Sequence, residues 1–293
     1  LSAWDSFSEL QKSILALLSL APYPVPLQSV SDMFGTSVER ITTVIEPFVS
    51  SIGISHSEDG VLLRSRTLHA LVGLAAPNTT RQLAKKALQH FLPSLSDRAS
   101  ASHGLCAYYA RELSDNALAV DMAILAARHH ESSSDPASAV DFYQMALSVA
   151  ENQAPPETAL VLSSAIRLLG RLGNREQFLE RAQQSERLLE TTDLVPRTSL
   201  LLQLSRTYSS FDVFDRSLEL AQRIINLPDH ESTPSNKAEA LDIISLIYLR
   251  QGKTKEVIHT ARRSIRTLAH SGQKHEVFYA LEKLAGAFYL EGD

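Results

Sequence analysis

Hydrophobic positions over residues 134–293 recur in step with a series of short turns. The turns fall at Ser134-Asp135, Gly173-Asn174, Asp212-Val213, Gly252-Lys253 and Gly292-Asp293. Subtracting the first residue of each turn from the next gives separations of 39, 39, 40 and 40 residues. A repeat of this length holds two helices and a turn, so the pattern predicts a string of helical hairpins.

Equivalent positions in each hairpin carry residues that can pack against a neighbouring helix. Five, nine and twelve residues after a turn, side chains share one helix face, because steps of four and three return to the same side. These positions hold Ala139, Tyr143 and Ala146; Phe178, Ala182 and Ser185; Ser217, Ala221 and Ile224; and Val257, Ala261 and Ser264.

The helix before each turn has its own packing pair. Seven and four residues before the turn, a mostly small residue is followed by a larger one: Ala127 and His130, Ile166 and Leu169, Ser205 and Tyr208, Ser245 and Tyr248, Ala285 and Phe288. One hairpin cannot bury both faces alone, so we expect neighbouring hairpins to stack into an α-solenoid. The alternative, an irregular helix bundle, gives no reason for the turns to keep step.

This pattern resembles the tetratricopeptide repeat over residues 116–293. The likeness rests on the turn residue, the small residue before it, and the run Ala139-x-x-x-Tyr143-x-x-Ala146-Leu147. The period exceeds the usual thirty-four residues of that family. Its opening Trp and Leu-Gly signature is degraded in this chain.

A different pattern occupies the first 66 residues. Apolar spacing predicts helices over 5–20 and 27–34, and a third that begins at the capping box Thr36-Ser37-Val38-Glu39 and is bent or ended by Pro47. Apolar runs at 52–54 and 61–63 flank Asp59-Gly60, which predicts a β-hairpin. Three helices followed by a hairpin is the winged-helix order.

The predicted architecture is therefore all-α apart from that hairpin, in three parts. A winged-helix-like domain spans 1–66, connecting helices span 67–115, and a tetratricopeptide-like α-solenoid spans 116–293, truncated in its fifth hairpin. The connecting helices are expected over 66–92, interrupted at Ala76-Pro77-Asn78, and over 98–112. A first residue other than Met and a last residue within a turn suggest a piece of a longer protein.

The predicted winged helix carries few of the basic residues that a DNA-binding surface needs. Its third helix has Arg40 against Glu39 and Glu46, and the hairpin tip carries Glu58 and Asp59. Phosphate contacts need Lys and Arg on that face, so contact with protein is favoured over DNA.

The order of parts resembles the region after the nucleotide-binding module of STAND signalling ATPases, such as maltose-regulator-like transcription regulators. Short motifs carry the likeness, at Arg64-Ser65-Arg66-Thr67-Leu68-His69, Arg81-Gln82-Leu83-Ala84, residues 108–115 and Ala126-Ala127-Arg128. The resemblance implies a repeat arm that senses an inducer or a partner. The loop G-x-x-x-x-G-K-[ST] does not occur in the chain, so nucleotide hydrolysis by these residues is not expected.

Composition narrows the function further. A net charge of −5 disfavours a general nucleic-acid surface. The single cysteine, Cys106, lies in an apolar run and is predicted to be buried filler, which fits a reducing cytoplasm. No apolar run is long enough to span a bilayer, and no His, Cys or Ser motif predicts a metal site or catalysis. We therefore expect neither enzyme activity nor a cofactor.

Candidate binding residues come from a row of arginines. Arg128, Arg167 and Arg206 each lie six residues before a turn, and Leu246 replaces the arginine in the fourth hairpin. The tetratricopeptide resemblance places this position on a concave groove, together with Asp121, Ile124 and Glu131; Leu160, Ser163 and Gly170; and Ser199, Leu202 and Ser209. Aligned guanidiniums would suit a carboxylate, a phosphate or an acidic peptide. The alternative is that each arginine pairs with a neighbouring acid.

A second basic patch lies at Lys253, Lys255, Arg262, Arg263 and Arg266. A solvated outer face is favoured there over contact with nucleic acid or an acidic protein.

Three functions remain open from the sequence. The first is a sensor or interaction module that binds a protein, a peptide or a small effector in the groove. A passive assembly scaffold is the second. The third is a nucleic-acid-binding regulator that uses the winged helix and the basic patch.

Overall fold

The computed structural model describes residues 2–51, 53–65, 70–72, 77–96, 102–150, 155–191, 197–269, 281, 284–286 and 288. Contacts divide the chain into two compact units, Leu1–Asn152 and Gln153–Asp293. Each unit is built from helices that pack against their neighbours in the chain, so the predicted all-α, solenoid-like fold class is confirmed. The predicted domain boundaries at 66 and 115 stay predictions.

The first unit opens with helices α1 (Ser2–Asp5), α2 (Glu9–Leu18), α3 (Leu27–Phe34) and α4 (Val38–Ser51), followed by strands β1 (Ile54–Ser57) and β2 (Gly60–Leu63). The two strands pair antiparallel, with Ile54 opposite Leu63 and Ser57 opposite Gly60. Buried apolar side chains of α2, α4 and β2, such as Leu17, Ile45 and Leu63, form the core of this part.

The helices and the hairpin of this part differ from the predicted ones in four places. Ser8 forms a capping box with Gln11 that starts α2 afresh, so the predicted helix over 5–20 is split. The cap of α4 is Ser37, whose Oγ accepts from the Arg40 amide at 3.3 Å, and not Thr36. Pro47 lies inside α4, which continues to Ser51. Strand β1 begins at Ile54 instead of residue 52.

A backbone bridge that the sequence did not predict ties the hairpin to the loop after α2. The amides and carbonyls of Val25 and Val61 exchange two hydrogen bonds of 2.9 Å. Gly60 allows this approach, because a Cβ at Gly60 would lie 2.3 Å from the Val25 carbonyl oxygen. The helices, the hairpin and this bridge follow the order expected for a winged helix, an assignment that stays a prediction.

Helical packing continues through α6 (Pro77–Phe91), the short 3₁₀ helix η1 (Leu92–Ser96), α7 (Ser102–Glu112), α8 (Asn116–Ser132) and α9 (Pro136–Ala150). Each of α7, α8 and α9 packs on the helix before it, and α6 also packs on α2 and α3. Most of the predicted helix before Pro77 lies outside the described residues, although 70–72 are helical.

Aromatic stacking joins the two ends of the first unit. The ring of Tyr23, in the loop after α2, stacks on Phe142 of α9 with centroids 5.0 Å apart and also contacts Tyr108 of α7. Gly104 makes room, because a Cβ there would lie 2.5 Å from Cζ of Phe142. Cys106 lies on α7, as Tyr108 does, and is fully buried. Burial raises the pKa of its thiol to about 12. The prediction of a buried cysteine is confirmed.

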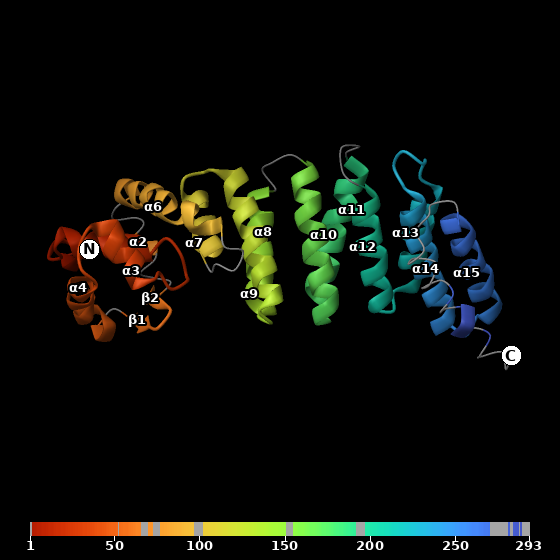
Figure 1. Cartoon of the computed structure of the whole chain (residues 1–293), viewed down its shortest axis with the longest axis horizontal. Helices are drawn as coiled ribbons and strands as arrows, with labels where there is room; N and C mark the ends of the chain where they lie inside the picture. Colours follow the sequence, from red (N-terminus) through yellow and green to blue (C-terminus); the bar gives the residue numbers. More distant parts are fainter. Residues whose placement is uncertain are drawn as a thin grey trace. The chain divides into compact units, whose positions relative to one another are not determined.

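Over residues 155–269, the described part of the second unit holds three hairpins, shown in green to blue in Figure 1: α10 (Pro155–Leu172) with α11 (Arg175–Thr191), α12 (Arg197–Ser210) with α13 (Phe214–Asn226), and α14 (Pro234–Arg250) with α15 (Thr254–Ala269). The first helix of each hairpin packs on the first helix of the next, since α10 contacts α12 and α12 contacts α14. The first helices therefore form one layer of the unit.

From α7 to α15, each helical hairpin that the structure describes turns through one left-handed residue. Its φ lies between 59° and 68° at Ser114, Ser134, Gly173, Asp212 and Gly252. The amide of the next residue then donates to the carbonyl five positions earlier, from Asp115, Asp135, Asn174, Val213 and Lys253, at 2.9–3.1 Å. This is the Schellman arrangement, which satisfies the last carbonyls of a helix. Four of the turns were predicted, whereas Ser114-Asp115 was missed.

In three of these turns, the residue whose amide closes the turn also caps the following helix with its side chain. The side-chain oxygens of Asp115, Asp135 and Asn174 accept the amide three residues later at 3.2–3.3 Å. A helix end and a helix start thus share two residues, which leaves no slack in the loop.

The positions counted from the turns form the interior. For the four turns from Ser134 to Gly252, every residue five, nine or twelve places after the turn, or seven before it, is at most 1% exposed. Four places before the turn, Leu169 and Tyr208 are buried, while His130 and Tyr248 are partly exposed. Ala285 of the predicted fifth hairpin is exposed, contrary to the pattern, and the turn at Gly292-Asp293 lies outside the described residues.

The turn geometry predicts opposite effects of glycine and alanine. Ser134→Gly should raise the free energy of unfolding by about 1 kcal/mol, because glycine adopts a positive φ without strain. Gly252→Ala should lower it by a similar amount, although the added Cβ meets nothing within 4 Å, since the cost lies in the backbone. Urea unfolding followed by circular dichroism measures both. Ser133, at φ −88°, is the control: if Ser133→Gly stabilises as much as Ser134→Gly, the turn is not the cause.

Close approach of α12 and α13 predicts intolerance of a larger residue at Ser205. Its hydroxyl donates to the Ser217 carbonyl at 2.9 Å, the Ser217 hydroxyl donates back at 2.6 Å, and both side chains are fully buried. Ser205→Ala should cost about 1 kcal/mol of unfolding free energy and Ser205→Leu more than about 2 kcal/mol. Ser199→Leu, on the exposed side of α12, should stay within about 0.5 kcal/mol of wild type. Equal effects of the two leucines would contradict the packing described.

Candidate functional site

A pocket of about 470 Å³ opens on the layer of first helices in the second unit. We call it the α12–α14 pocket. Its lining residues are Arg206, Ser209 and Ser210 from α12; Ser235, Ala238, Glu239, Asp242, Ile243, Leu246 and Arg250 from α14; and Leu268 from α15. Two predicted groove residues, Arg206 and Ser209, therefore meet in one pocket with Leu246, which takes the arginine position of the next hairpin.

Two charged contacts bridge α12 and α14 at this pocket. Arg206 forms an ion pair with Glu239, and Arg250 donates from Nη1 to the Ser209 carbonyl at 2.9 Å and to Asp212 Oδ1 at 3.2 Å. The arginine side chains are 54% and 42% exposed. Pairs this exposed contribute little to stability, so their partners can exchange when a ligand arrives.

Part of the pocket wall is apolar. Ala238, Ile243 and Leu268 are buried, while Leu246 is 36% exposed. An apolar wall beside a few charged groups is typical of sites that take side chains of a peptide or a small molecule.

The structure places the three predicted arginines on exposed helix positions but in different units. Arg128 belongs to the first unit, whereas Arg167 and Arg206 belong to α10 and α12, which pack on each other in the second. Alignment of all three stays a prediction. For Arg206, the Glu239 pair agrees with the alternative that the arginine is matched by a neighbouring acid.

Several of the predicted groove residues, including Ser209, are largely buried. Leu202 and Ile124 are 5% and 7% exposed, so they offer almost no surface to a ligand. Ser209 is 3% exposed, and its hydroxyl has no hydrogen-bond partner in the structure. Gly170 lies against the Thr207 side chain, which a Cβ would approach to 2.8 Å. Leu202, Ser209 and Gly170 lie on α10 and α12, whose contacts with neighbouring first helices the spacing of the sequence alone does not reveal.

The other predicted residues lie nearer the surface. Asp121, Leu160 and Ser199 are exposed, and Ser163 is partly exposed. Glu131 is partly buried and accepts a hydrogen bond of 2.7 Å from the Tyr143 hydroxyl, so it links α8 to α9. In the basic patch, Lys255, Arg262, Arg263 and Arg266 are all exposed on α15.

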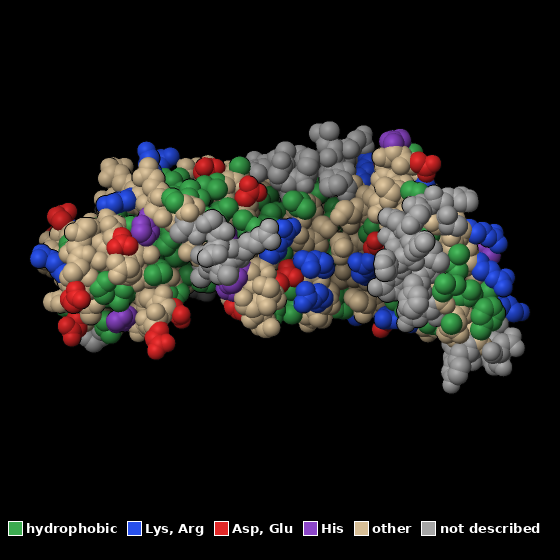
Figure 2. All heavy atoms as spheres, viewed as in Figure 1, with side chains coloured by type: hydrophobic (Ala, Val, Ile, Leu, Met, Phe, Trp, Pro, Cys, Tyr) green, Lys and Arg blue, Asp and Glu red, His purple; other side chains and the backbone are tan. Residues whose placement is uncertain are grey.

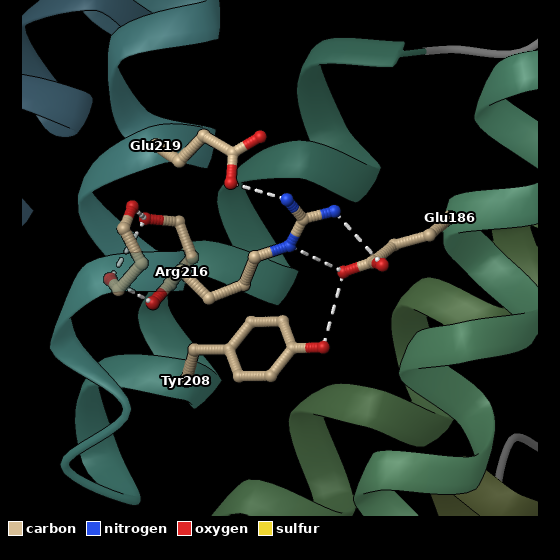
Figure 3. Close-up of polar contacts among 6 residues, drawn as sticks. Glu186, Tyr208, Arg216 and Glu219 are labelled. Carbon is tan, nitrogen blue, oxygen red and sulfur yellow. Dashed lines mark hydrogen bonds and ion pairs between the residues drawn. The ribbon is translucent and has the colours of Figure 1, made fainter.

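A polar network that the sequence did not reveal ties α11, α12 and α13 together around Tyr208, the larger residue four places before its turn (Figure 3). Glu186 of α11 accepts from the Tyr208 hydroxyl at 3.1 Å and pairs with Arg216 of α13 at 3.0 Å, while Arg216 also pairs with Glu219. Burial and the Glu186 carboxylate raise the pKa of Tyr208 to about 12. Hydrogen bonding to Glu186 raises the pKa of Arg216 above its ordinary value.

Removal of the Glu186 charge tests whether this network holds the helices. Glu186→Gln should lower the free energy of unfolding by about 1–2 kcal/mol, a value discounted because Glu186 and Arg216 are 20% and 31% exposed. The matched control is Glu219→Gln, which removes the other partner of Arg216 at a 54% exposed position and should change stability by less than about 0.5 kcal/mol. Denaturant unfolding compares them, and equal losses would rule out a special role for Glu186.

Comparisons with known proteins give a fold but no family. No protein-family model matches the sequence, and a search of curated proteins finds no match. Among solved structures, BtubC (BKLC) from P. vanneervenii is similar to this chain with a TM-score of 0.51 and 17% identity, covering 70% of this chain and 87% of BtubC. At this identity the likeness shows the helical fold alone.

A STAND protein with a tetratricopeptide repeat sensor, from Pyrococcus horikoshii, is also similar, with a TM-score of 0.48 and 11% identity. The match covers 98% of this chain and 48% of that protein, so this chain spans about half its length. The likeness is too weak to support an argument about function. Within the described ranges, no helix combines the length and apolarity needed to cross a bilayer.

Proposed function

We propose that the chain is a non-catalytic interaction module, and that the α12–α14 pocket binds a peptide segment of a partner protein. The observation that carries this proposal is the position of Leu246. It is an exposed leucine in a pocket whose other apolar side chains are buried, and charged side chains surround it. Such an arrangement gives a partner side chain apolar contact and gives its flanking polar groups exchangeable ion pairs.

Charge in the pocket favours a peptide over a simple anion. Arg206 pairs with Glu239 and Arg250 with Asp212, and the carboxylate of Asp242 also lines the pocket. An isolated phosphate or carboxylate would have to displace Glu239 from Arg206 while it faced Asp242. A peptide with charges of both signs can replace these pairs one by one, and its apolar side chain can cover Leu246.

The N-terminal part fits a protein-contacting winged helix in this proposal. Its three helices, its hairpin and the Val25–Val61 bridge supply the elements, while Glu39, Glu58 and Asp59 disfavour a DNA phosphate backbone. The resemblance of short sequence motifs to those of STAND proteins favours a place in a larger cytoplasmic signalling ATPase or transcription regulator, where the helical repeats would act as a sensor arm. A passive scaffold is the alternative.

Selection from a random peptide library displayed on phage, with the full chain as bait, tests the pocket. Peptides that bind wild type should lose about tenfold or more in affinity to Leu246→Asp, because a charge replaces the apolar contact. The control is Leu179→Asp on α11, since Leu179 is 37% exposed and lies outside the pocket. It should bind within about twofold of wild type.

Two outcomes would contradict the proposed function. In the first, the library yields no peptide that binds wild type above background. In the second, the selected peptides bind Leu246→Asp and Leu179→Asp equally well.

A further inference from the structure

A second groove lies on the other layer of the same unit. It has a volume of about 530 Å³ and runs between α13 and α15, with α14 below them. We call it the α13–α15 groove. It is lined by Leu218, Glu219 and Gln222 from α13; Leu241, Ile244 and Tyr248 from α14; and Lys255, Glu256, His259, Thr260 and Arg263 from α15. It shares no lining residue with the α12–α14 pocket.

The floor of this groove is apolar. Leu241 and Ile244 of α14 are 2% and 7% exposed, and Leu218 of α13 is partly exposed beside them. Leu218 therefore supplies exposed apolar surface in the groove, above the buried Leu241 and Ile244, and an apolar side chain of a ligand can pack against it.

One rim of the groove is a row of basic side chains. Lys255, His259 and Arg263 lie four residues apart, so they share a face of α15, and Arg262 and Arg266 extend the row. All these side chains are exposed. Lys and Arg side chains gather over this end of the molecule in Figure 2.

These basic side chains lack the ion pairs that several other cations of the unit have. Arg206, Arg216, Lys237 and Arg250 each form an ion pair. Among the residues whose contacts the structure describes, the side chains of Lys255, Arg262, Arg263 and Arg266 form neither an ion pair nor a hydrogen bond. Helix α15 carries these four cations against one carboxylate, Glu256, in a chain whose net charge is −5.

We propose that the α13–α15 groove docks an acidic amphipathic peptide segment of a partner protein. An apolar side chain of the segment would cover Leu218, and its carboxylates would pair with Lys255 and Arg263. Charge complementarity carries this assignment, because the unpaired cations on one rim attract an anionic partner, while Leu218 offers it an apolar contact.

The groove suits a peptide better than a nucleic acid. The carboxylates of Glu219 and Glu256 line the same groove, so a continuous phosphate backbone would face like charges along it. Tyr248 is the aromatic ring that lines it, and the Lys253 ammonium lies 5.7 Å from that ring's centroid, where a stacked base would have to sit. A peptide can place its carboxylates at α15 alone.

Fluorescence anisotropy with the full chain and a defined peptide set tests the proposal. The probe is a fluorescein-labelled peptide with Glu and Leu at helical spacing. Two comparison peptides replace Glu by Gln or Leu by Ser, and a labelled single-stranded oligonucleotide represents nucleic acid. The variant is Lys255→Glu with Arg263→Glu. The matched control is Arg175→Glu with Arg223→Glu, the same charge change at exposed positions outside the groove.

The Glu-Leu peptide should bind wild type at least about tenfold more tightly than either comparison peptide or the oligonucleotide. The groove variant should weaken this binding by about tenfold or more, and the control variant by less than about threefold. Equal weakening by both variants would show only a general charge effect and would overturn the proposal. So would equal binding of the Leu→Ser peptide, tighter binding of the oligonucleotide, or no binding of the Glu-Leu peptide.

Discussion

The left-handed residue in each helix–helix turn is the constraint on which the packing of this chain depends. One residue with φ near 60° reverses the chain, and the next amide closes on a carbonyl of the helix that has just ended. The residue after the one that donates this amide already belongs to the next helix. The loop therefore fixes how the second helix faces the first. For the four turns from Ser134 to Gly252, the positions five, nine and twelve residues after the turn are therefore buried in every hairpin.

Small residues at the contacts between helices also determine how the hairpins pack. Alanine or serine at positions such as Ala182, Ala221 and Ala261 lets helices approach closely, and larger residues such as Phe178 and Tyr208 fill the space between hairpins. In the second unit this packing separates a layer of first helices from a layer of second helices. Both candidate binding surfaces follow from the separation, since the α12–α14 pocket opens on one layer and the α13–α15 groove on the other.

Regular spacing made the interior of the hairpins predictable, and its absence explains what was missed. The turn at Ser114-Asp115 has the same geometry as the others, but it lies only half a period before Ser134 and so falls outside the spacing of the repeat. The Val25–Val61 bridge is a single residue pair, too short to leave an alternating pattern. Partners such as Arg206 and Glu239 are 33 residues apart on neighbouring helices, and spacing does not identify them. For the same reason, sequence placed Leu202 in a groove, although contact between α10, α12 and α14 buries it.

Residue-resolved hydrogen exchange by nuclear magnetic resonance tests the turn geometry most directly. The amides of Asp115, Asp135, Asn174, Val213 and Lys253 lie at loop positions, yet each donates to a carbonyl five residues earlier. The account predicts that all five exchange slowly, at rates close to those of the adjoining helix interiors. Exchange at the rate of an unstructured peptide at these amides would contradict it, because the hairpins would then lack the closure that orients their helices.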